Sequence, residues 1–156
     1  MNSLTTNLNF LQQVTWKLTI QNSKFSNLEY FCTSVNLPSI SMGEIKENFR
    51  NQQGFFPGET ISYEPLRLKF MVAEDMSNYV EALNWMQTNA TASGQQLRCD
   101  LILSVLTSKN TINRQFQFHD AFPTSIGELQ FDTQAQTIQY LPCDITLRFN
   151  GFKVLK

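Results

Sequence analysis

Apolar and polar residues alternate along several stretches of this chain, and a period of two is typical of half-buried β-strands. The alternation predicts strands over residues 14–20, 28–32, 64–72, 97–107, 113–119 and 137–149, with a weaker strand over 42–49. Asn22 and Ser23 are turn residues between the first two strands, so residues 14–34 are expected to form a β-hairpin. In the last strand the alternation slips by one residue at Pro142, which predicts a β-bulge there.

The chain is expected to turn a corner after the strand over 113–119. Proline fixes φ and lacks a backbone donor, so Pro123 is expected to stop that strand near Phe122. Residues 124–127 then supply turn chemistry, and alternation resumes at Leu129 and Phe131.

Apolar residues change to helical spacing after residue 72. The stripe consists of Met76, Tyr79, Val80, Leu83 and Met86. Asp75 is expected to cap the helix, or Ser77 if the helix starts later, and the helix should end near Thr88. A single helix beside many strands must bury its stripe on a sheet or on the end of a barrel. The predicted fold is therefore mainly β (α+β), an antiparallel β-sandwich or barrel with one packed α-helix.

Residues 50–59 interrupt the pattern and are expected to form an extended, irregular loop. They are Arg50, Asn51, Gln52, Gln53, Gly54, Phe55, Phe56, Pro57, Gly58 and Glu59. Glycine and proline punctuate the segment, yet a solvated loop has no reason to expose two adjacent phenylalanines. Two explanations stay open: one ring folds back as a plug over the core, or both contact a neighbouring subunit. Residues 50–59 are therefore the candidate site, and the expected role is an interface for ring stacking or for contact between subunits.

Composition narrows the functional classes. The 156 residues predict a single domain, 1–156, with an N-terminal arm over 1–13 and a C-terminal tail over 150–156. Net charge is −1 and only 16% of residues are charged, which argues against non-specific nucleic-acid binding and suits a protein that packs against its own copies. No apolar run approaches the roughly 20 residues of a membrane span, so no membrane partner is expected. The first ten residues lack the pattern of a secretory signal.

Catalytic and cofactor chemistry are not expected. His119, the one histidine, neighbours Asp120 but has no nucleophile motif nearby, so a hydrogen-bonded structural role is favoured. Cys32, Cys99 and Cys143 are scattered in expected strands, which favours reduced, buried thiols over a disulfide or metal site. The sequence predicts no enzyme, no cofactor and no metal.

Three ordered motifs carry a resemblance to a known family. They are Phe-Pro-Thr-Ser-Ile-Gly-Glu-Leu at 122–129 with Thr-Ile-Gln at 137–139, Phe-Cys at 31–32 with Leu-Pro at 37–38, and a run from Leu66 through Glu74-Asp75 to Trp85. This order resembles the tail tube proteins of contractile-tailed bacteriophages over roughly residues 14 to 149. Phe55-Phe56-Pro57 and the segment 151–156 depart from the family pattern, so a main tube subunit and a related baseplate ring both stay open.

The resemblance implies a structural virion protein of the tail. Members form hexameric rings that stack into a tube, through which DNA passes without specific binding, and an extended loop in the place of residues 50–59 joins the rings. The implied partners are further copies of the chain, the tail sheath, and baseplate or neck proteins, with assembly in the host cytoplasm. The alternatives are a baseplate tube-initiator ring, a ring protein like that of type VI secretion and, from a different class, a monomeric β-barrel binding module.

Overall fold

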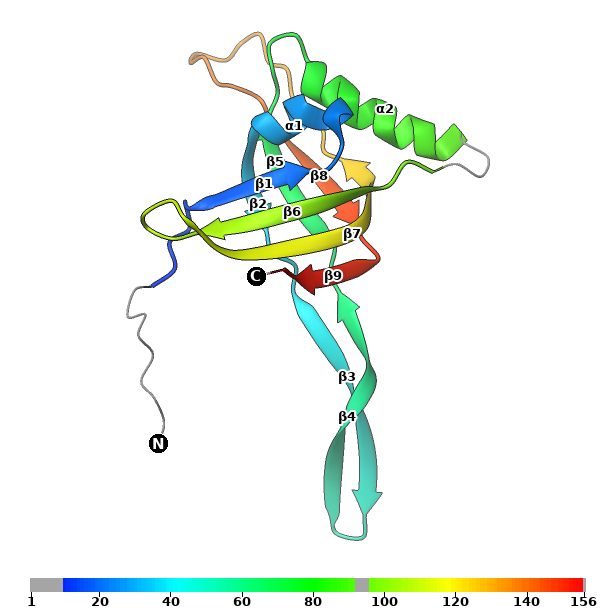
Figure 1. Cartoon of the computed structure of the whole chain (residues 1–156). Helices are drawn as coiled ribbons and strands as arrows, with labels where there is room; N and C mark the ends of the chain where they lie inside the picture. The colour runs from blue at the N-terminus through cyan, green and yellow to red at the C-terminus, as the bar shows by residue number, and fades with distance from the viewer. Residues whose placement is uncertain (1–9, 92–95, 156) are drawn as a thin grey trace.

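The computed structural model describes residues 10–91 and 96–155 (Figure 1). Nine strands, two α-helices and one 3₁₀ helix form in this part of the chain. In chain order they are β1 (Trp16–Ile20), η1 (Ser23–Phe25), α1 (Ser26–Tyr30), β2 (Cys32–Asn36), β3 (Ile40–Phe49), β4 (Gln52–Tyr63), β5 (Leu66–Met71), α2 (Ser77–Thr91), β6 (Cys99–Leu106), β7 (Ile112–Ile126), β8 (Pro142–Arg148) and β9 (Gly151–Val154). No helix within these ranges has the length and apolar character needed to span a lipid bilayer.

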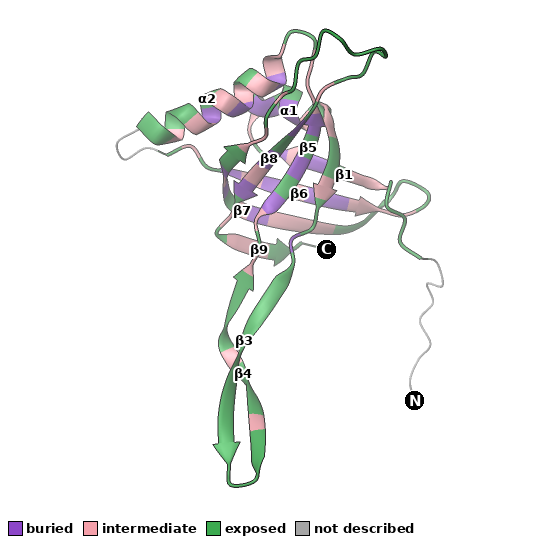
Figure 2. Cartoon of the chain, turned by 180° about the vertical axis from the view of Figure 1, so that it is seen from behind, coloured by how far each residue is buried: buried purple, intermediate pink, exposed green. Residues whose placement is uncertain are grey.

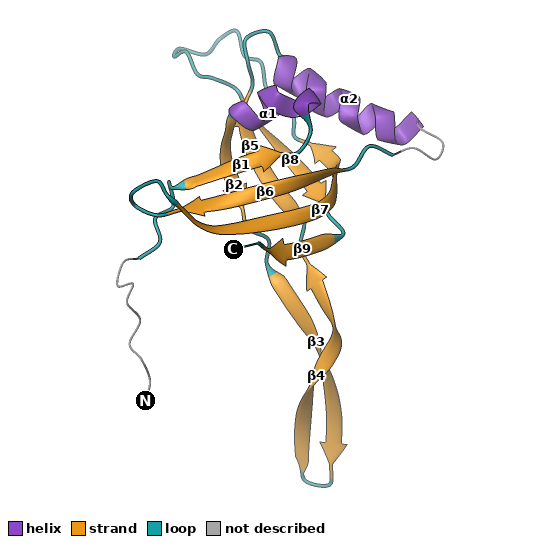
Figure 3. Ribbon diagram, viewed as in Figure 1, coloured by secondary structure: helices purple, strands orange, loops and turns teal. Residues whose placement is uncertain are grey.

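One long strand, β7, joins two layers of antiparallel sheet. The strand order is β1-β6-β7-β8-β5-β2, and β9 also pairs with β7. The first part of β7 pairs with β6 and β9, while its last residues pair with β8. The sheet therefore folds over β7 into a sandwich that approaches a barrel (Figure 3). The predicted antiparallel, mainly β fold is confirmed, and the short α1 is an addition to it.

Strand β7 does not stop near Phe122 as expected. Pro123 lies opposite Leu147 in the pairing with β8, and the register shifts between Pro123 and Ser125. A register irregularity accommodates a residue that has no N–H to donate. The proline therefore marks the place where β7 passes from one layer to the other, and residues 127–141 that follow form no strand.

The core lies between the two layers and is built from the alternating strands. Its members include Leu18, Ile20, Leu101, Leu103 and Phe118 from one layer and Leu66, Leu68, Phe70, Cys143, Ile145 and Leu147 from the other. Residues two apart on a strand share a face, so the alternation in the sequence places these side chains inside. Apart from Pro38 in the link from β2 to β3, the buried residues lie in the sandwich and in the helices above it (Figure 2).

The helix α2 forms where expected but buries a different face. Its buried residues are Asn78, Ala82 and Trp85, whereas Val80 is exposed. The expected stripe of Met76, Tyr79, Val80, Leu83 and Met86 is therefore wrong, although Tyr79 packs partly against the core. Asp75 accepts a hydrogen bond from the Ser77 N–H at 3.1 Å, and this bond lowers the pKa of Asp75. The helix ends at Thr91 rather than near Thr88.

Residues 14–34 do not form a hairpin. β1 pairs with β6 and β2 pairs with β5, and η1 and α1 lie between them. Leu28 and Tyr30, expected on a strand, belong to α1. Alternation over so few residues also fits a single helical turn, and the true partners of β1 and β2 are distant in sequence.

Both chain ends differ from expectation. Residues 137–141 form no strand and β8 begins at Pro142, so the phase slip marks the start of a strand rather than a bulge. The tail expected over 150–156 contains β9, which pairs with β7. Most of the arm expected over 1–13 lies outside the described residues, and residues 10–13 form neither helix nor strand.

Candidate assembly surfaces

The segment expected to be irregular is regular β-structure. Arg50 and Asn51 form the turn between β3 and β4, whose pairing runs from Ile40 opposite Tyr63 to Phe49 opposite Gln52. The other predicted site residues, Gln52, Gln53, Gly54, Phe55, Phe56, Pro57, Gly58 and Glu59, all belong to β4. The two strands form a sheet of their own that projects from the sandwich (Figure 1). Each strand has a free edge, which is where proline is tolerated.

One face of this β3–β4 hairpin is apolar toward its tip. Ile45 lies directly opposite Phe56, and Phe49 follows on the same face, with Glu47 between them, because side chains alternate along a strand. The Phe49 ring covers Gly54, where an added Cβ would lie 2.7 Å from a ring carbon. Gly54 therefore has the role of accommodating an aromatic ring, and not the role of making the chain mobile.

The opposite face carries Phe55. It pairs with Lys46, whose Nζ lies 5.9 Å from the Phe55 ring centroid. Phe55 and Phe56 are 58% and 46% exposed and neither belongs to the core cluster, so the plug explanation is wrong for this subunit. The hairpin exposes further large apolar side chains that the sequence reasoning did not single out, namely Ile40, Met42, Ile45, Phe49 and Ile61. Such a concentration is typical of an interaction surface.

Two glycines, Gly43 and Gly58, lie where the backbones of the hairpin strands are in close contact. The register shifts between Met42 and Glu44, which is the position of Gly43. A Cβ added at Gly58 would lie 2.3 Å from the Gly43 carbonyl oxygen, whereas one added at Gly43 meets nothing within 4 Å. Only the absence of a side chain at Gly58 lets the backbones approach this closely.

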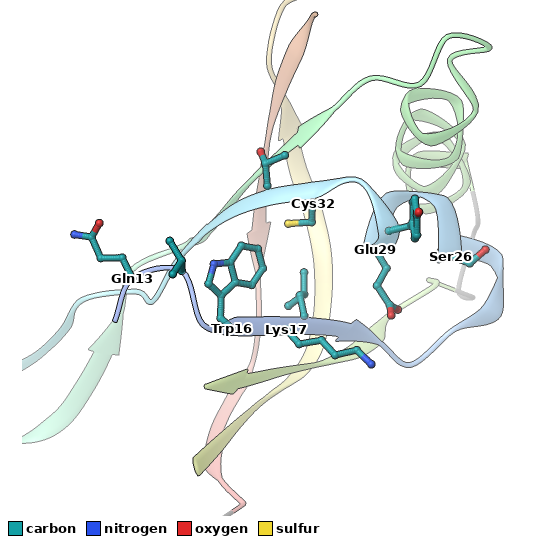
Figure 4. Close-up of a pocket in the computed structure, with 10 residues that line it drawn as sticks. Gln13, Trp16, Lys17, Ser26, Glu29 and Cys32 are labelled. Atoms are coloured by element: carbon teal, nitrogen blue, oxygen red, sulfur yellow. The ribbon is translucent and has the colours of Figure 1, made fainter. Parts of the chain in front are cut away.

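A second candidate surface is the open seam between β1 and β2. These two strands are the ends of the sheet path and do not pair with each other. A groove of about 650 Å³ separates them. In Figure 4, Trp16 projects from β1 and Cys32 from β2 into this space, while Glu29 reaches down from α1.

The edge of β1 at this seam keeps unpaired backbone groups. The Gln21 N–H donates to the Asp100 carbonyl of β6, so Ile20, Leu18 and Trp16 direct their backbone groups away from β6. The Ile20 N–H donates to the Glu29 carboxylate at 3.0 Å. Within the described residues no partner is recorded for the outward groups of Leu18 and Trp16, and a free edge of this kind is a template for another strand.

The family described as T4-like virus tail tube protein gp19 matches residues 9–153, nearly the whole chain. The chain belongs to this tail tube family. The recognition made from the sequence motifs is confirmed, and the family role is structural.

Individual relatives agree with this assignment. The chain is 22% identical to a tail tube protein of Serratia phage KSP90 over 149 residues, covering 86% of this chain and 84% of the relative. It is 25% identical to a tail tube terminator protein of Enterobacteria phage T4 over 109 residues, covering 64% of this chain and 61% of the relative's length. The chain thus spans less than two thirds of that terminator.

Solved structures agree on the fold. A subunit from the sheath-tube complex of an extracellular contractile injection system, PVC, superimposes with a TM-score of 0.71 at 17% identity, covering 97% of this chain and 98% of that one. Hcp1 of Flavobacterium johnsoniae matches with a TM-score of 0.54 at 14% identity, covering 94% and 95% of the two chains. The tail tube fold of this chain is thus shared with proteins of very different sequence.

His119 takes part in a polar cluster that braces a bulge between β6 and β7. Its Nδ1 lies 3.3 Å from Oδ2 of Asp100, and the same carboxylate accepts hydrogen bonds from the Gln117 side chain and the Asp120 N–H at 3.2 and 3.1 Å. Asp120 has a φ of 52°, and the register shifts between Cys99 and Leu101. The carboxylate thus fixes an unusual backbone conformation.

We expect His119→Gln to lower the free energy of unfolding by about 1 kcal/mol or less, because an amide can replace the hydrogen bond. Asp100→Ala should cost more, about 1–3 kcal/mol, because the Gln117 side chain and the Asp120 N–H both lose their acceptor. Urea denaturation of both variants measures the difference. A larger loss for His119→Gln than for Asp100→Ala would contradict this assignment of roles.

The three cysteines are free thiols on strands, with Cys99 and Cys143 buried and Cys32 half-buried. Burial raises the pKa of the Cys32 thiol to about 11, opposed only in part by a hydrogen bond with the Ser34 backbone. Burial also raises the pKa of Cys99 and of Cys143. The thiol forms are therefore favoured, as predicted for structural cysteines.

Alkylation of Cys32 in the folded protein should accordingly be slow at pH 8. A thiol with a pKa of about 11 is only about 0.1% thiolate at that pH, so the rate should rise about tenfold per pH unit as pH approaches 11. Mass spectrometry after timed iodoacetamide treatment measures the rate, and protein unfolded in urea is the control. Equal rates for folded and unfolded protein at pH 8 would contradict the burial of this thiol.

Proposed function

We propose that this chain is the ring-forming subunit of a contractile tail tube. Six copies close into a ring, the rings stack, and the resulting tube is the conduit for DNA ejection. The family membership, the free edge of β1 at the seam and the apolar β3–β4 hairpin support this proposal. Antiparallel edges pair across copies, and head-to-tail contacts close into a ring when the rotation closes.

The single observation that carries the proposal is the β3–β4 hairpin. It exposes seven large apolar side chains on a two-stranded sheet that extends beyond the sandwich (Figure 1). On a monomer such a surface is an aggregation hazard, whereas at a contact it buries a large apolar area. We therefore assign residues 50–59, with their partners in β3, to the contact between successive rings.

The low charge fits the proposed lumen. A conduit must pass DNA without holding it, and tight non-specific binding of DNA rests on clustered lysine and arginine. A net charge of −1 on 156 residues supplies no such excess. In this proposal the subunit has no catalytic role, needs no cofactor, and contacts the sheath outside the tube and baseplate or neck proteins at its ends.

A terminator or initiator ring is the second candidate. The likeness to a tail tube terminator protein favours it over the more distant readings, a type VI-like ring or a monomeric binding module. The two candidates differ in what the purified chain does alone. A main tube subunit propagates into long tubes, while a terminator remains a single ring, and either belongs to the virion tail after assembly in the host cytoplasm.

The experiment is a comparison of two double variants. Phe55→Ser with Phe56→Ser removes one aromatic ring from each face of the hairpin, and Asn48→Ser with Gln53→Ser changes an exposed polar cross-strand pair. We expect the first pair to keep single rings and an unchanged melting temperature but to lose long tubes in negative-stain micrographs. The second pair should still form tubes. Normal tubes from the phenylalanine variant would contradict stacking by the hairpin.

A further inference from the structure

An apolar hollow lies at the end of the subunit opposite the β3–β4 hairpin. It has a volume of about 750 Å³ and lies between the start of α2 and the loop 127–141. Its lining is mostly apolar and includes Phe31, Met76, Phe131 and Tyr140. We call it the apical hollow.

The loop 127–141 beside the apical hollow presents large apolar side chains to solvent. Phe131, Ile138 and Tyr140 are 72%, 96% and 81% exposed. Tyr30, at the end of α1, is also exposed and stands edge-on to Phe31 with ring centroids 5.0 Å apart. A loop has no reason to leave such side chains in water unless a partner covers them.

The rim of the apical hollow is acidic. Glu74 lines it, Asp75 follows, and Glu128 and Asp132 line an adjoining depression in the same loop. Neither residues 72–77 nor residues 127–141 contain a lysine or arginine. Among the described residues, none of these four carboxylates takes part in a salt bridge. The apical end therefore offers apolar surface surrounded by unpaired negative charge.

The tip of the β3–β4 hairpin has the opposite character. Arg50 is the one charged residue between 48 and 58, and it forms no salt bridge within the described part of the chain. Phe49 precedes it in the chain and is exposed, and the exposed Phe56 lies farther down the same face, opposite Ile45. An arginine at the end of an exposed apolar strand face matches an apolar hollow with a carboxylate rim in both polarity and charge.

The two surfaces also face in opposite directions. Figures 1 and 2, which differ by a half-turn about the vertical axis, both place the hairpin at the lower end and the loop 127–141 at the upper end. Two complementary patches at opposite ends of one chain make a head-to-tail contact, which repeats without limit when copies are related by translation and rotation along one axis.

We propose that the apical hollow of one copy receives the β3–β4 hairpin tip of a copy in the adjacent ring, with Arg50 placed among Glu74, Glu128 and Asp132. This assignment rests on the proposed stacking function and adds the surface that the hairpin binds. It makes every subunit both donor and acceptor, so that rings polymerise in one polarity.

Charge reversal tests the match. Arg50→Glu should abolish tubes while rings remain, and adding Glu74→Lys with Glu128→Lys in the same chain should restore them. The matched control adds Glu64→Lys with Asp120→Lys instead, two exposed acidic residues outside both the β3–β4 hairpin and the apical hollow, giving the same net charge without restoration. Glu74 and Glu128 suit the test because their side chains form no salt bridge within the described residues. Equal restoration by both combinations would overturn the proposal.

Cross-linking separates this proposal from stacking itself. Tubes that carry Asn51→Cys at the tip and Gln139→Cys at the apical hollow should yield a ladder of disulfide-linked multimers on oxidation. Tubes that pair Asn51→Cys with Ser108→Cys, on the exposed β6–β7 turn, should not. Hairpin-dependent tubes that form only the second cross-link would overturn the apical hollow as acceptor and leave the proposed function standing. If the unmodified chain forms no stacked rings at all, both fail.

Discussion

Trp85→Ala should lower the free energy of unfolding by about 3–5 kcal/mol, the usual cost of removing a fully buried aromatic side chain. Trp85 is 1% exposed. Its ring stacks on Phe25 with centroids 4.4 Å apart, and its Nε1 donates to the Leu97 carbonyl at 2.7 Å. The substitution opens a cavity between α2 and η1 and removes one donor from a half-buried carbonyl.

The neighbouring change Asn84→Ala is the control. Asn84 is exposed on the same helix, so its truncation should cost under about 0.5 kcal/mol. Leu83→Ala, on the face favoured by the sequence pattern, should cost less than Trp85→Ala because Leu83 is only half-buried. Chemical denaturation of the three variants measures the order. A loss for Leu83→Ala that equals or exceeds the loss for Trp85→Ala would show that the helix packs by its other face.

The sequence predicted that α2 forms, but it did not predict which face of α2 is buried. Apolar residues occur on more than one side of α2, so spacing alone supports two overlapping stripes. The buried Asn78 decides between them, because its side chain accepts from the Ala73 N–H at 3.1 Å and donates to the Met71 carbonyl at 2.6 Å. Those bonds tie the start of the helix to the end of β5. A polar anchor of this kind has no signal in a hydrophobic pattern.

The strands of the core were predictable because their burial follows the hydrophobic pattern directly. On β5 the period of two is uninterrupted, and on β6 it holds from Cys99 to Leu103 before the buried Ser104 breaks it. The pairing of β1 with β6 and of β2 with β5 was not predictable, because it brings together segments far apart in the sequence. The same limit applies to the assembly surfaces, since both the seam and the apical hollow are built from distant segments.

The segment 50–59 was expected to be an irregular loop, but residues 52–59 belong to β4. Glycine and proline are depleted in strands, so their density there favours a loop. In a two-stranded sheet each residue has only one neighbouring strand, and Pro57 and the glycines fit without breaking a ladder on two sides. Its two phenylalanines were the informative signal, and the weaker strand expected over 42–49 is part of its partner, β3.

Gly58→Ala adds a single methyl group, and we expect it to abolish long tubes because Gly58 is in close contact with the backbone of Gly43. Gly58→Ala places a Cβ 2.3 Å from the Gly43 carbonyl oxygen, and since the obstacle is backbone, the strands must separate or change register. The distal hairpin, with its Ile45–Phe56 pair, would then change direction or lose order. The sandwich core contains neither glycine, so its melting temperature should stay within about a degree, because a change under about 0.5 kcal/mol moves it little.

Gly43→Ala is the matched control, since it puts the same methyl group at the same crossing but into open space. We expect rings from both variants by size-exclusion chromatography with light scattering, and long tubes in micrographs from Gly43→Ala alone. If neither variant forms tubes, glycine at this crossing serves chain flexibility rather than close backbone approach. If Gly58→Ala forms tubes of normal length, the close contact between Gly58 and Gly43 does not orient the hairpin tip toward the next ring.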